Sequence, residues 1–494
     1  MAGVELKQLK GRFTVRQQET PLFSALMRHV QGKPLQYHVP GHKGGRAAWS
    51  GLLEAWGDQV FAYDLTELDS LDDLHAPGGV IREAELLAAA AFGAQRTHFL
   101  TAGATAGIIA SVMACCKPGD KVLLPRNVHR SVIAAVILVD AYPVFMQPEF
   151  DDLAGVYTGL VPQTVEDHLR AYPEATLLVL VNPTYHGACG DIADLVDCAR
   201  ERGVPVLVDE AHGSHFPFYR EFPPSGLAVG ADLVVHAVHK TLGALTGGAM
   251  VHMGRESRVP ERRLRSALRL VHTTSPSYLT MASLDAARMQ AVTRPAAQWS
   301  HALALAHEVR RAASLTEGFL PHPPRFPRPG YVAQDPLKVV LVSDGRWRGQ
   351  DLARALTGLG HYPELTGDNH VLLVMGVGDQ ASAKDLVNAL AMVVSVPGPG
   401  TGTQVSCVPK TIPPVAMRPR QAAFSQWRTL PLEKAGGLVA GEMIVPYPPG
   451  VAVICPGELI TAEMVGFLMD LLSRGHSAHG IGPPPDYLVS VVEE

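Results

Sequence analysis

The sequence predicts an α/β fold built on a mainly parallel sheet. From about Thr97 onward, short runs rich in valine and leucine alternate with amphipathic stretches such as 191–202. The runs lie at residues 121–125, 177–181, 204–208 and 232–236. Strands that are apolar along their whole length are buried on both faces, which is typical of parallel strands covered by helices. Such a sheet binds its ligands beyond the carboxyl ends of its strands, so residues that follow the runs are the first candidates for a site.

Segments rich in proline divide the chain, whose 494 residues are enough for two or three domains. A proline-rich stretch at 321–336 precedes a new pattern of strand, helix, strand and helix. These four elements are expected at 338–342, 349–359, 371–375 and 381–394. A second loop, rich in proline and glycine, follows at 397–402. The expected parts are an N-terminal arm at 1–30, a large domain at 31–320, a small α/β domain at 321–400 and a C-terminal domain at 401–494.

Composition and charge exclude several classes of protein. Hydrophobic residues make up 47% and charged residues 18% of the chain, as in ordinary globular proteins. A net charge of −5 gives no general attraction to nucleic acid or to an anionic membrane. The N-terminal sequence lacks the apolar core of a secretory signal, and no apolar run is long enough to span a bilayer. None of the six cysteines forms a CxxC pair, which argues against structural zinc. We expect a cytoplasmic protein with no bound metal and with neither nucleic acid nor membrane as a partner.

Asp209 and Lys240 each follow an apolar run, where a ligand would bind. Asp209 directly follows the run at 204–208, and a carboxylate buried there needs a cation, such as a protonated pyridine nitrogen. Lys240 precedes a glycine-rich loop at 242–248. Burial or nearby cations can lower the pKa of a lysine in a cleft, so that its amine can attack an aldehyde. Taken alone, Asp209 has the simpler explanation of a turn cap, and Lys240 that of a solvated side chain.

Two further segments contain groups that a phosphorylated aromatic cofactor requires. Gly103, Ala104 and Thr105 lie in a run of small residues that opens a predicted helix, where backbone N–H groups favour a phosphate. His129 follows the run at 121–125 and can lie flat against an aromatic ring. An ordinary turn and a structural histidine are the simpler explanations of these two segments alone. Together, the four segments contain the phosphate turn, stacking ring, pyridine partner and Schiff-base lysine of a pyridoxal phosphate (PLP) site.

With these motifs in this order, the sequence resembles the Orn/Lys/Arg decarboxylase family, a branch of the fold type I, or aspartate aminotransferase-like, PLP enzymes. The motifs are HVPGHKGG at 38–45, DLTE at 64–67, LDDLH at 71–75, PRNVH at 125–129, NPTYHG at 182–187, DEAHG at 209–213, HKT at 239–241, TTSPS at 273–277, YPPG at 447–450 and PGE at 456–458. The proportions are similar to those of the shorter members, which lack an N-terminal wing domain. The resemblance implies a PLP-binding large domain with a mainly parallel sheet, followed by smaller α/β C-terminal domains.

The resemblance also implies PLP-dependent decarboxylation of arginine, lysine or ornithine to agmatine, cadaverine or putrescine and CO2. It implies that Lys240 carries the cofactor as a Schiff base, that Asp209 pairs with the pyridine nitrogen and that His129 stacks on the ring. With His212, which would lie beside the cofactor, these three form the expected catalytic set. The remaining expected cofactor contacts are with the phosphate, and they come from Gly103, Ala104, Thr105 and His239.

The distal cation of a basic substrate requires an acidic partner. Asp64 and Glu67 belong to a group of carboxylates at 64–73 and are candidates for this contact. Glu442 and Glu458 are the other candidates. A solvated face of the protein is the simpler explanation for the group at 64–73 as a whole.

Two positions depart from the family pattern. Ala104 and Ala237 stand where members commonly have a hydroxyl side chain near the phosphate. Each missing neutral hydrogen bond is worth about 1 kcal/mol, so the affinity for the cofactor would be lower. The resemblance further implies at least a homodimer, in which residues 273–277 reach the neighbouring subunit's cofactor.

Other functions compete with decarboxylation. An aminotransferase, another PLP lyase and a weakly active PLP-binding paralogue all remain open. A helicase reading of the residues 209–212 is rejected, because the chain has no phosphate-binding GxxxxGK[ST] loop. His212 and His215 have the spacing of neither a helical HExxH pair nor a zinc finger, so we expect no metal there.

Overall fold

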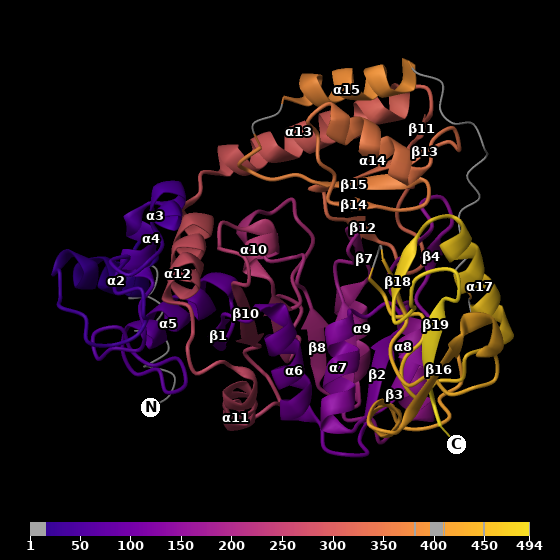
Figure 1. Ribbon diagram of the computed structural model, residues 1–494, viewed down its shortest axis with the longest axis horizontal. Coiled ribbons are helices and arrows are strands. Elements are labelled where there is room, and N and C mark those ends of the chain that lie inside the picture. Colours follow the sequence, from indigo (N-terminus) through magenta and orange to yellow (C-terminus); the bar gives the residue numbers. More distant parts are fainter. Residues whose placement is uncertain (1–15, 380–381, 396–408, 410, 448–449, 494) are drawn as a thin grey trace. The chain divides into compact units, whose positions relative to one another are not determined.

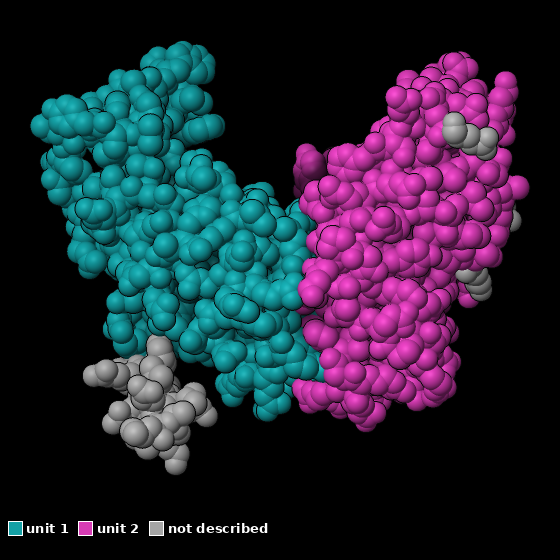
Figure 2. All heavy atoms as spheres, turned by 90° about the horizontal axis from the view of Figure 1, so that it is seen from below, with its two compact units in different colours: residues 1–114, 207–295 teal, residues 115–206, 296–494 magenta. Residues whose placement is uncertain are grey.

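The computed structural model describes residues 16–379, 382–395, 409, 411–447 and 450–493. The chain forms two compact units, each made of two separate stretches of sequence (Figure 2). Unit 1 contains Met1–Ala114 and Leu207–Pro295, and unit 2 contains Cys115–Val206 and Ala296–Glu494. Among the described residues, no helix is both long enough and apolar enough to cross a bilayer.

The strands of unit 1 are buried along their length and lie in the order β1-β10-β9-β8. They are β1 (Arg96–Leu100), β8 (Val206–Asp209), β9 (Leu233–His236) and β10 (Ala249–Met253). Strands β8 and β9 are parallel, with Asp209 opposite Val235, whereas β10 runs antiparallel to both β9 and β1. The parallel pair brings the residues after β8 and after β9 to one edge of the sheet, as expected for a ligand site.

Unit 1 also contains helices. They are α2 (Pro21–Gln31), α3 (Ser50–Trp56), α4 (Asp58–Tyr63), α5 (Val80–Phe92), α6 (Gly103–Cys115), α10 (Val238–Thr241), α11 (Glu261–Val271) and α12 (Tyr278–Thr293). Of these, α5 and α12 pack against β1, and α10 packs against β10. Helix α5 ends at Gly93, whose φ of 79° suits a residue without a side chain. Helix α12 begins after Ser277, whose side chain accepts a hydrogen bond from the backbone N–H of Thr280.

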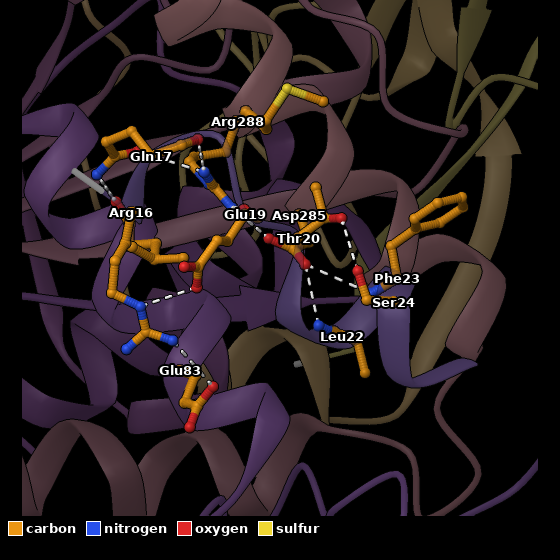
Figure 3. A network of polar contacts seen from close by, with 12 residues as sticks. Arg16, Gln17, Glu19, Thr20, Leu22, Phe23, Ser24, Glu83, Asp285 and Arg288 are labelled. Carbon is orange, nitrogen blue, oxygen red and sulfur yellow. Dashed lines mark hydrogen bonds and ion pairs between the residues drawn. The ribbon is translucent and has the colours of Figure 1, made fainter. Parts of the chain in front are cut away.

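The N-terminal segment is fastened to α12 by a buried ion pair (Figure 3). Asp285 and Arg288, one turn apart on α12, are both completely buried and lie 2.6 Å from each other. The backbone N–H of Leu22 donates to Asp285 at 3.0 Å, and Arg288 donates to the carbonyls of Gln17 and Glu19 at 2.6 Å each. We call Asp285 and Arg288 the arm anchor. The residues expected as a lead-in arm therefore include a packed helix, α2, with Leu22 and Leu26 among its buried residues.

Unit 2 contains a fully parallel group of strands in the order β6-β2-β3. They are β2 (Lys121–Pro125), β3 (Tyr142–Met146) and β6 (Leu177–Val181), and they alternate with helices α7 (Arg130–Val139), α8 (Pro162–Ala171) and α9 (Ile192–Glu201). The short strands are β4 (Phe150–Asp151), β5 (Val156–Tyr157), β7 (Ala188–Cys189) and β12 (Ala333–Gln334). The prediction of a mainly parallel sheet is confirmed, and the reversed strand β10 is the exception.

A second sheet in unit 2 is antiparallel, in the order β11-β13-β15-β14. Its strands are β11 (Phe319–Leu320), β13 (Lys338–Ser343), β14 (Leu365–Thr366) and β15 (His370–Val374). Helices α13 (Ala296–Leu315), α14 (Gly349–Gly358) and α15 (Ala383–Ser395) lie together over it (Figure 1). Their apolar residues and those of the sheet form one core. The strand, helix, strand and helix expected from 338 onward are confirmed, with Ala381 and the loop at 397–402 outside the described residues.

The C-terminal part of unit 2 surrounds helix α17 (Ala462–Ser473), whose first turn is capped by the Thr461 side chain. Two strand pairs, β16 (Trp427–Pro431) with β19 (Leu488–Val492) and β17 (Val445–Tyr447) with β18 (Ser477–His479), accompany it and the short helix α16 (Pro419–Ala423). A separate apolar core includes Leu468, Ile454 and Val491. The boundaries of the four expected parts stay a prediction.

Candidate active site

Lys240 and His212 meet at the carboxyl edge of the parallel pair β8 and β9. Lys240 lies in the short helix α10, directly after β9, and its side chain is exposed. The buried His212 follows β8, and its Nε2 lies 3.0 Å from the Nζ of Lys240. An ammonium group can donate to the imidazole at this distance, and a protonated Nε2 can donate to a free amine. The pair can therefore hold a proton in either state of the lysine, which suits a nucleophilic amine.

Asp209 is the last residue of β8 and is only 6% exposed. One carboxylate oxygen accepts a hydrogen bond from the backbone N–H of Ala211 at 3.2 Å. In the part of the chain that the structure describes, no lysine, arginine or histidine forms an ion pair with this carboxylate. A buried carboxylate without a cationic partner is costly. The site therefore suits a ligand that brings its own cation to Asp209.

The predicted phosphate turn opens helix α6. Gly103 has a φ of 74°, in the left-handed region that favours glycine, and its N–H donates to the carbonyl of Gly247. Ala104 is half-buried, and Thr105, whose side chain carries a hydroxyl group, is exposed. The N–H groups of a first helical turn have no acceptor within the helix, so they are available to an anion. A side chain at Gly107 would contact Leu100 within 3.0 Å, so this glycine lets α6 approach the sheet.

His239 precedes the lysine, and its side chain is tied to the same loop. Its Nδ1 donates to the backbone carbonyl of Gly248 at 2.9 Å, which leaves Nε2 without a proton in the neutral ring. His239 can therefore donate to a phosphate only when both ring nitrogens carry a proton. Ala237, which caps α10, is completely buried, so the wall of the site is apolar where a hydroxyl is common in the family.

His129 belongs to unit 2, where it caps helix α7. Its Nδ1 accepts the backbone N–H of Ser131 at 3.2 Å and lies 2.9 Å from the Ser131 hydroxyl. The ring is exposed and its orientation is fixed by the cap. Its stacking on a cofactor ring stays a prediction.

The four predicted acidic contacts have different surroundings. In unit 1, Asp64 lies 3.1 Å from the Nε2 of His42, whereas one oxygen of Glu67 is buried and has no hydrogen-bond partner. Burial, and next the carboxylate of Asp73, raise the pKa of Glu67. In unit 2, Glu442 accepts a hydrogen bond from Ser490 at 2.6 Å.

Glu458 has a structural role that the sequence analysis did not predict. Its carboxylate is completely buried in unit 2 and forms a two-pronged ion pair with Arg126, at 2.6 Å and 2.9 Å. The second oxygen also accepts the backbone N–H of Cys455 at 2.7 Å. Both oxygens are thus engaged within unit 2, and a contact of Glu458 with the substrate stays a prediction.

A row of buried polar side chains behind the strands of unit 1 was also missed. Glu210 directly follows Asp209, and one of its carboxylate oxygens lies 2.7 Å from the Nε2 of His236. His236 in turn lies 3.0 Å from His252, whose Nδ1 lies 2.7 Å from the hydroxyl of Thr97. Each group can donate one proton to the next: the Thr97 hydroxyl to His252, His252 to His236, and His236 to Glu210. Both imidazole rings can therefore stay neutral while every hydrogen bond is made. The sequence signal for this support was polar residues within the apolar strands β1, β9 and β10 and directly after β8.

Comparison with known proteins identifies the family. Residues 20–325 match the family described as Orn/Lys/Arg decarboxylase, major domain, and residues 403–480 match its C-terminal domain. The chain belongs to the Orn/Lys/Arg decarboxylase family. The arginine decarboxylase of Bacillus subtilis (strain 168) is 35% identical to it over 97% of this chain and 99% of that protein. The arginine decarboxylase of Bacillus anthracis is 36% identical over 95% of this chain and 96% of that protein.

Among solved structures, the Francisella novicida lysine decarboxylase LdcF is similar to this chain, with a TM-score of 0.84 and 20% sequence identity. The match covers 96% of this chain and 81% of LdcF. This likeness confirms the predicted aspartate aminotransferase-like fold. Membership of the Orn/Lys/Arg decarboxylase family confirms the predicted activity, PLP-dependent decarboxylation of a basic amino acid. The roles of individual site residues stay predictions.

The residues that unit 1 brings together fit PLP. The uncompensated carboxylate of Asp209 suits the protonated pyridine nitrogen, and the exposed amine of Lys240 suits the aldehyde. The first turn of α6 presents free N–H groups and the hydroxyl of Thr105 to a phosphate. Among the described residues, no group of three or more histidine, cysteine or acidic side chains is placed to hold a metal ion.

Proposed function

We propose that this decarboxylase acts on arginine and produces agmatine and CO2. The observation that carries the proposal is the difference between two groups of relatives. Four relatives named arginine decarboxylase are 35–37% identical over 89–97% of the chain. Two relatives named lysine decarboxylase are only 24–26% identical.

The residues of unit 1 have separate tasks in the proposed reaction. Bound PLP supplies the electron sink for the charge that is left at Cα when CO2 departs. Lys240 binds the cofactor through its amine, and Asp209 holds a proton at the pyridine nitrogen. The backbone N–H groups of Ala104 and Thr105 bind the phosphate. The Thr105 hydroxyl replaces one of the two hydroxyl donors that Ala104 and Ala237 lack.

The reaction consumes one proton, because the Cα–carboxylate bond breaks and a Cα–H bond forms. Lys240 and His212, whose nitrogens are 3.0 Å apart, are the groups that we propose to deliver this proton. The imidazole can pass a proton to the amine and recover one from solvent between turnovers. His212 thus exchanges a proton directly with the Nζ of Lys240. The neutral imidazole accepts this proton at its Nε2.

We assign the guanidinium of arginine to Glu67. Its buried oxygen lacks a hydrogen-bond partner, whereas Asp64 and Glu442 already have partners. A guanidinium binds a carboxylate through two parallel hydrogen bonds, which makes such an oxygen a strong acceptor. A Glu67→Gln variant should raise the KM for arginine at least tenfold with a smaller change in kcat. The matched control is Asp69→Asn, an exposed carboxylate of the same segment, which should change neither constant.

The test of the proposed reaction is product analysis with purified, PLP-loaded protein. Arginine should yield agmatine and CO2 in equal amounts, and the Lys240→Ala variant should yield neither and lose the visible absorbance band of the bound cofactor. A keto acid in place of CO2 would instead support an aminotransferase. A cofactor band without turnover on any basic amino acid would support an inactive paralogue.

We further propose that the enzyme works in the cytoplasm as a homodimer or a larger homo-oligomer, with residues 273–277 at the neighbouring subunit's cofactor. Thr273, Thr274 and Ser275 have exposed side chains with hydroxyl groups and lie shortly before helix α12, which Ser277 caps; their exposure supports this placement. Sedimentation of the active enzyme should give a dimer or a larger assembly. A fully active monomer would contradict the proposal.

A further inference from the structure

Two small cavities in unit 1 are both lined by His98, and nothing in the proposed reaction uses them. Each has a volume of about 20 Å³, and they share the walls formed by Pro77, Glu85, His98 and Arg265. The second also has His75, Arg269 and His272 in its wall, and we call it the α11 cavity. A volume of this size holds one occupant comparable to a water molecule.

Two imidazoles in the wall of the α11 cavity have nitrogens without partners. His98 is only 8% exposed, and its Nε2 is buried without a hydrogen-bond partner. The Nε2 of His272 is also buried without a hydrogen-bond partner. Burial lowers the pKa of His98 to about 3 and that of His272 to about 4, so both rings are neutral at pH 7 and each carries one N–H. An unsatisfied buried polar group costs about 1–3 kcal/mol, and in a native protein it calls for a missing partner.

The charge around the α11 cavity is positive. The side chain of Arg265 is half-buried in α11 and, within the described ranges, forms neither a hydrogen bond nor an ion pair, although its charge acts on the carboxyl of Glu85. Arg269 adds a second guanidinium, whose Nε donates to the carbonyl of His75. Glu85 is the acidic residue in the wall, and burial raises its pKa to about 8, so it is largely uncharged at pH 7. One Glu85 oxygen accepts the N–H of Phe99 at 3.0 Å, and the other faces the Nδ1 of His98 at 3.9 Å.

We propose that the α11 cavity is a binding site for one small inorganic anion of halide size, held by Arg265 and by the imidazoles of His98 and His272. The anion would satisfy the unused donors and neutralise the unpaired guanidinium. A halide matches the small volume of the cavity. This site is distinct from the site of Lys240 and does not depend on which amino acid the enzyme uses.

Two observations connect the α11 cavity to the site of the proposed reaction. His98 lies on β1, which ends at Leu100 shortly before the phosphate turn at Gly103. His272 directly precedes Thr273, whose carbonyl accepts a hydrogen bond from the Nε2 of His75. An anion bound between His98 and His272 would therefore stabilise the approach to the phosphate turn and the start of the loop 273–277 together.

The test is a bromide titration of the PLP-loaded protein at constant ionic strength, with gluconate as the replacement anion and the thermal midpoint Tm as readout. The wild type should show a saturable rise in Tm, because an anion that binds only the folded state stabilises it by mass action. In Arg265→Gln the concentration for half-saturation should rise tenfold or more. The matched control, Arg262→Gln, removes an exposed arginine from the same helix and should behave as the wild type.

Crystals grown with bromide provide an independent readout, in which anomalous density should lie between Arg265 and His98.

A bromide titration at several pH values tests the role of Glu85. The bromide affinity should fall as the pH rises through about 8, because ionised Glu85 repels the anion, and Glu85→Gln should abolish that fall. An equal and unsaturable bromide response in Arg265→Gln and Arg262→Gln would overturn the proposal. So would an empty α11 cavity in the bromide crystals, or saturation by sulfate but not by bromide.

Discussion

The arm anchor and the α11 cavity are both buried polar groups in unit 1, but their hydrogen bonding differs. Asp285 and Arg288 bind each other and the backbone of the N-terminal segment, and among the described residues only the Nε of Arg288 is left without a partner in this pair. At the α11 cavity, the Nε2 of His98 and the guanidinium of Arg265 have no partner among the described residues. A buried polar group whose bonds are made within the chain stabilises the fold. One whose bonds are left open indicates a ligand.

Arg288→Met should have the largest effect on stability. It leaves the carboxylate of Asp285 buried without its cation, which costs about 3–5 kcal/mol. The free energy of unfolding from denaturant titration should fall by this amount. The double variant with Asp285→Asn removes the stranded charge but keeps an acceptor for the N–H of Leu22, so it should regain part of the loss. If Arg288→Met lost less than about 1 kcal/mol, the arm anchor would not stabilise the fold as described.

Glu85→Gln should change the pH dependence of stability by an intermediate amount. The pKa of Glu85 is raised from 4.5 to about 8 in the folded state, so the folded protein holds a proton that the unfolded chain releases. Its contribution to stability is fully present below pH 4.5 and is lost as the pH rises toward 8, by about 1.4 kcal/mol per pH unit. The variant has no proton to release, so its free energy of unfolding should fall less steeply between about pH 5 and pH 8. Parallel curves for the variant and the wild type would show that Glu85 is not protonated in the folded protein.

Arg265→Gln should have the smallest effect in the absence of an anion. Because its guanidinium makes no bond within the described part of the chain, its removal should change the free energy of unfolding by less than about 0.5 kcal/mol. The measurement is denaturant unfolding in gluconate buffer, beside Arg262→Gln. A loss as large as that of Arg288→Met would show that Arg265 is a structural residue, and the contrast between the two regions would disappear.

The fold could be predicted from the sequence where local patterns determine it. The runs at 121–125 and 177–181 are strands with those bounds, because residues apolar along their whole length are buried on both faces. Lys240 and His212 could be expected near each other, since they follow neighbouring parallel strands. The reversal of β10 could not be predicted, because a fully buried antiparallel strand has the same apolar pattern as a parallel one.

Long-range polar pairs could not be predicted either. Glu458, one of the candidate contacts for the substrate, is paired with Arg126, 332 residues earlier in the chain. Nothing in the local sequence of PGE at 456–458 indicates such a partner. The same holds for the α11 cavity, whose His98 and Arg265 lie in separate elements and come together only through the packing of α11 near β1.

A competition assay tests the central claim most directly. The PLP-loaded enzyme is given arginine, lysine and ornithine in equal amounts, and agmatine, cadaverine and putrescine are measured over the first few turnovers, with Lys240→Ala as the blank. The account predicts that agmatine is the dominant product and that the variant forms none of the three amines. Predominant cadaverine or putrescine would contradict the proposed substrate, and amine formation by the Lys240→Ala variant at the wild-type rate would contradict the site itself.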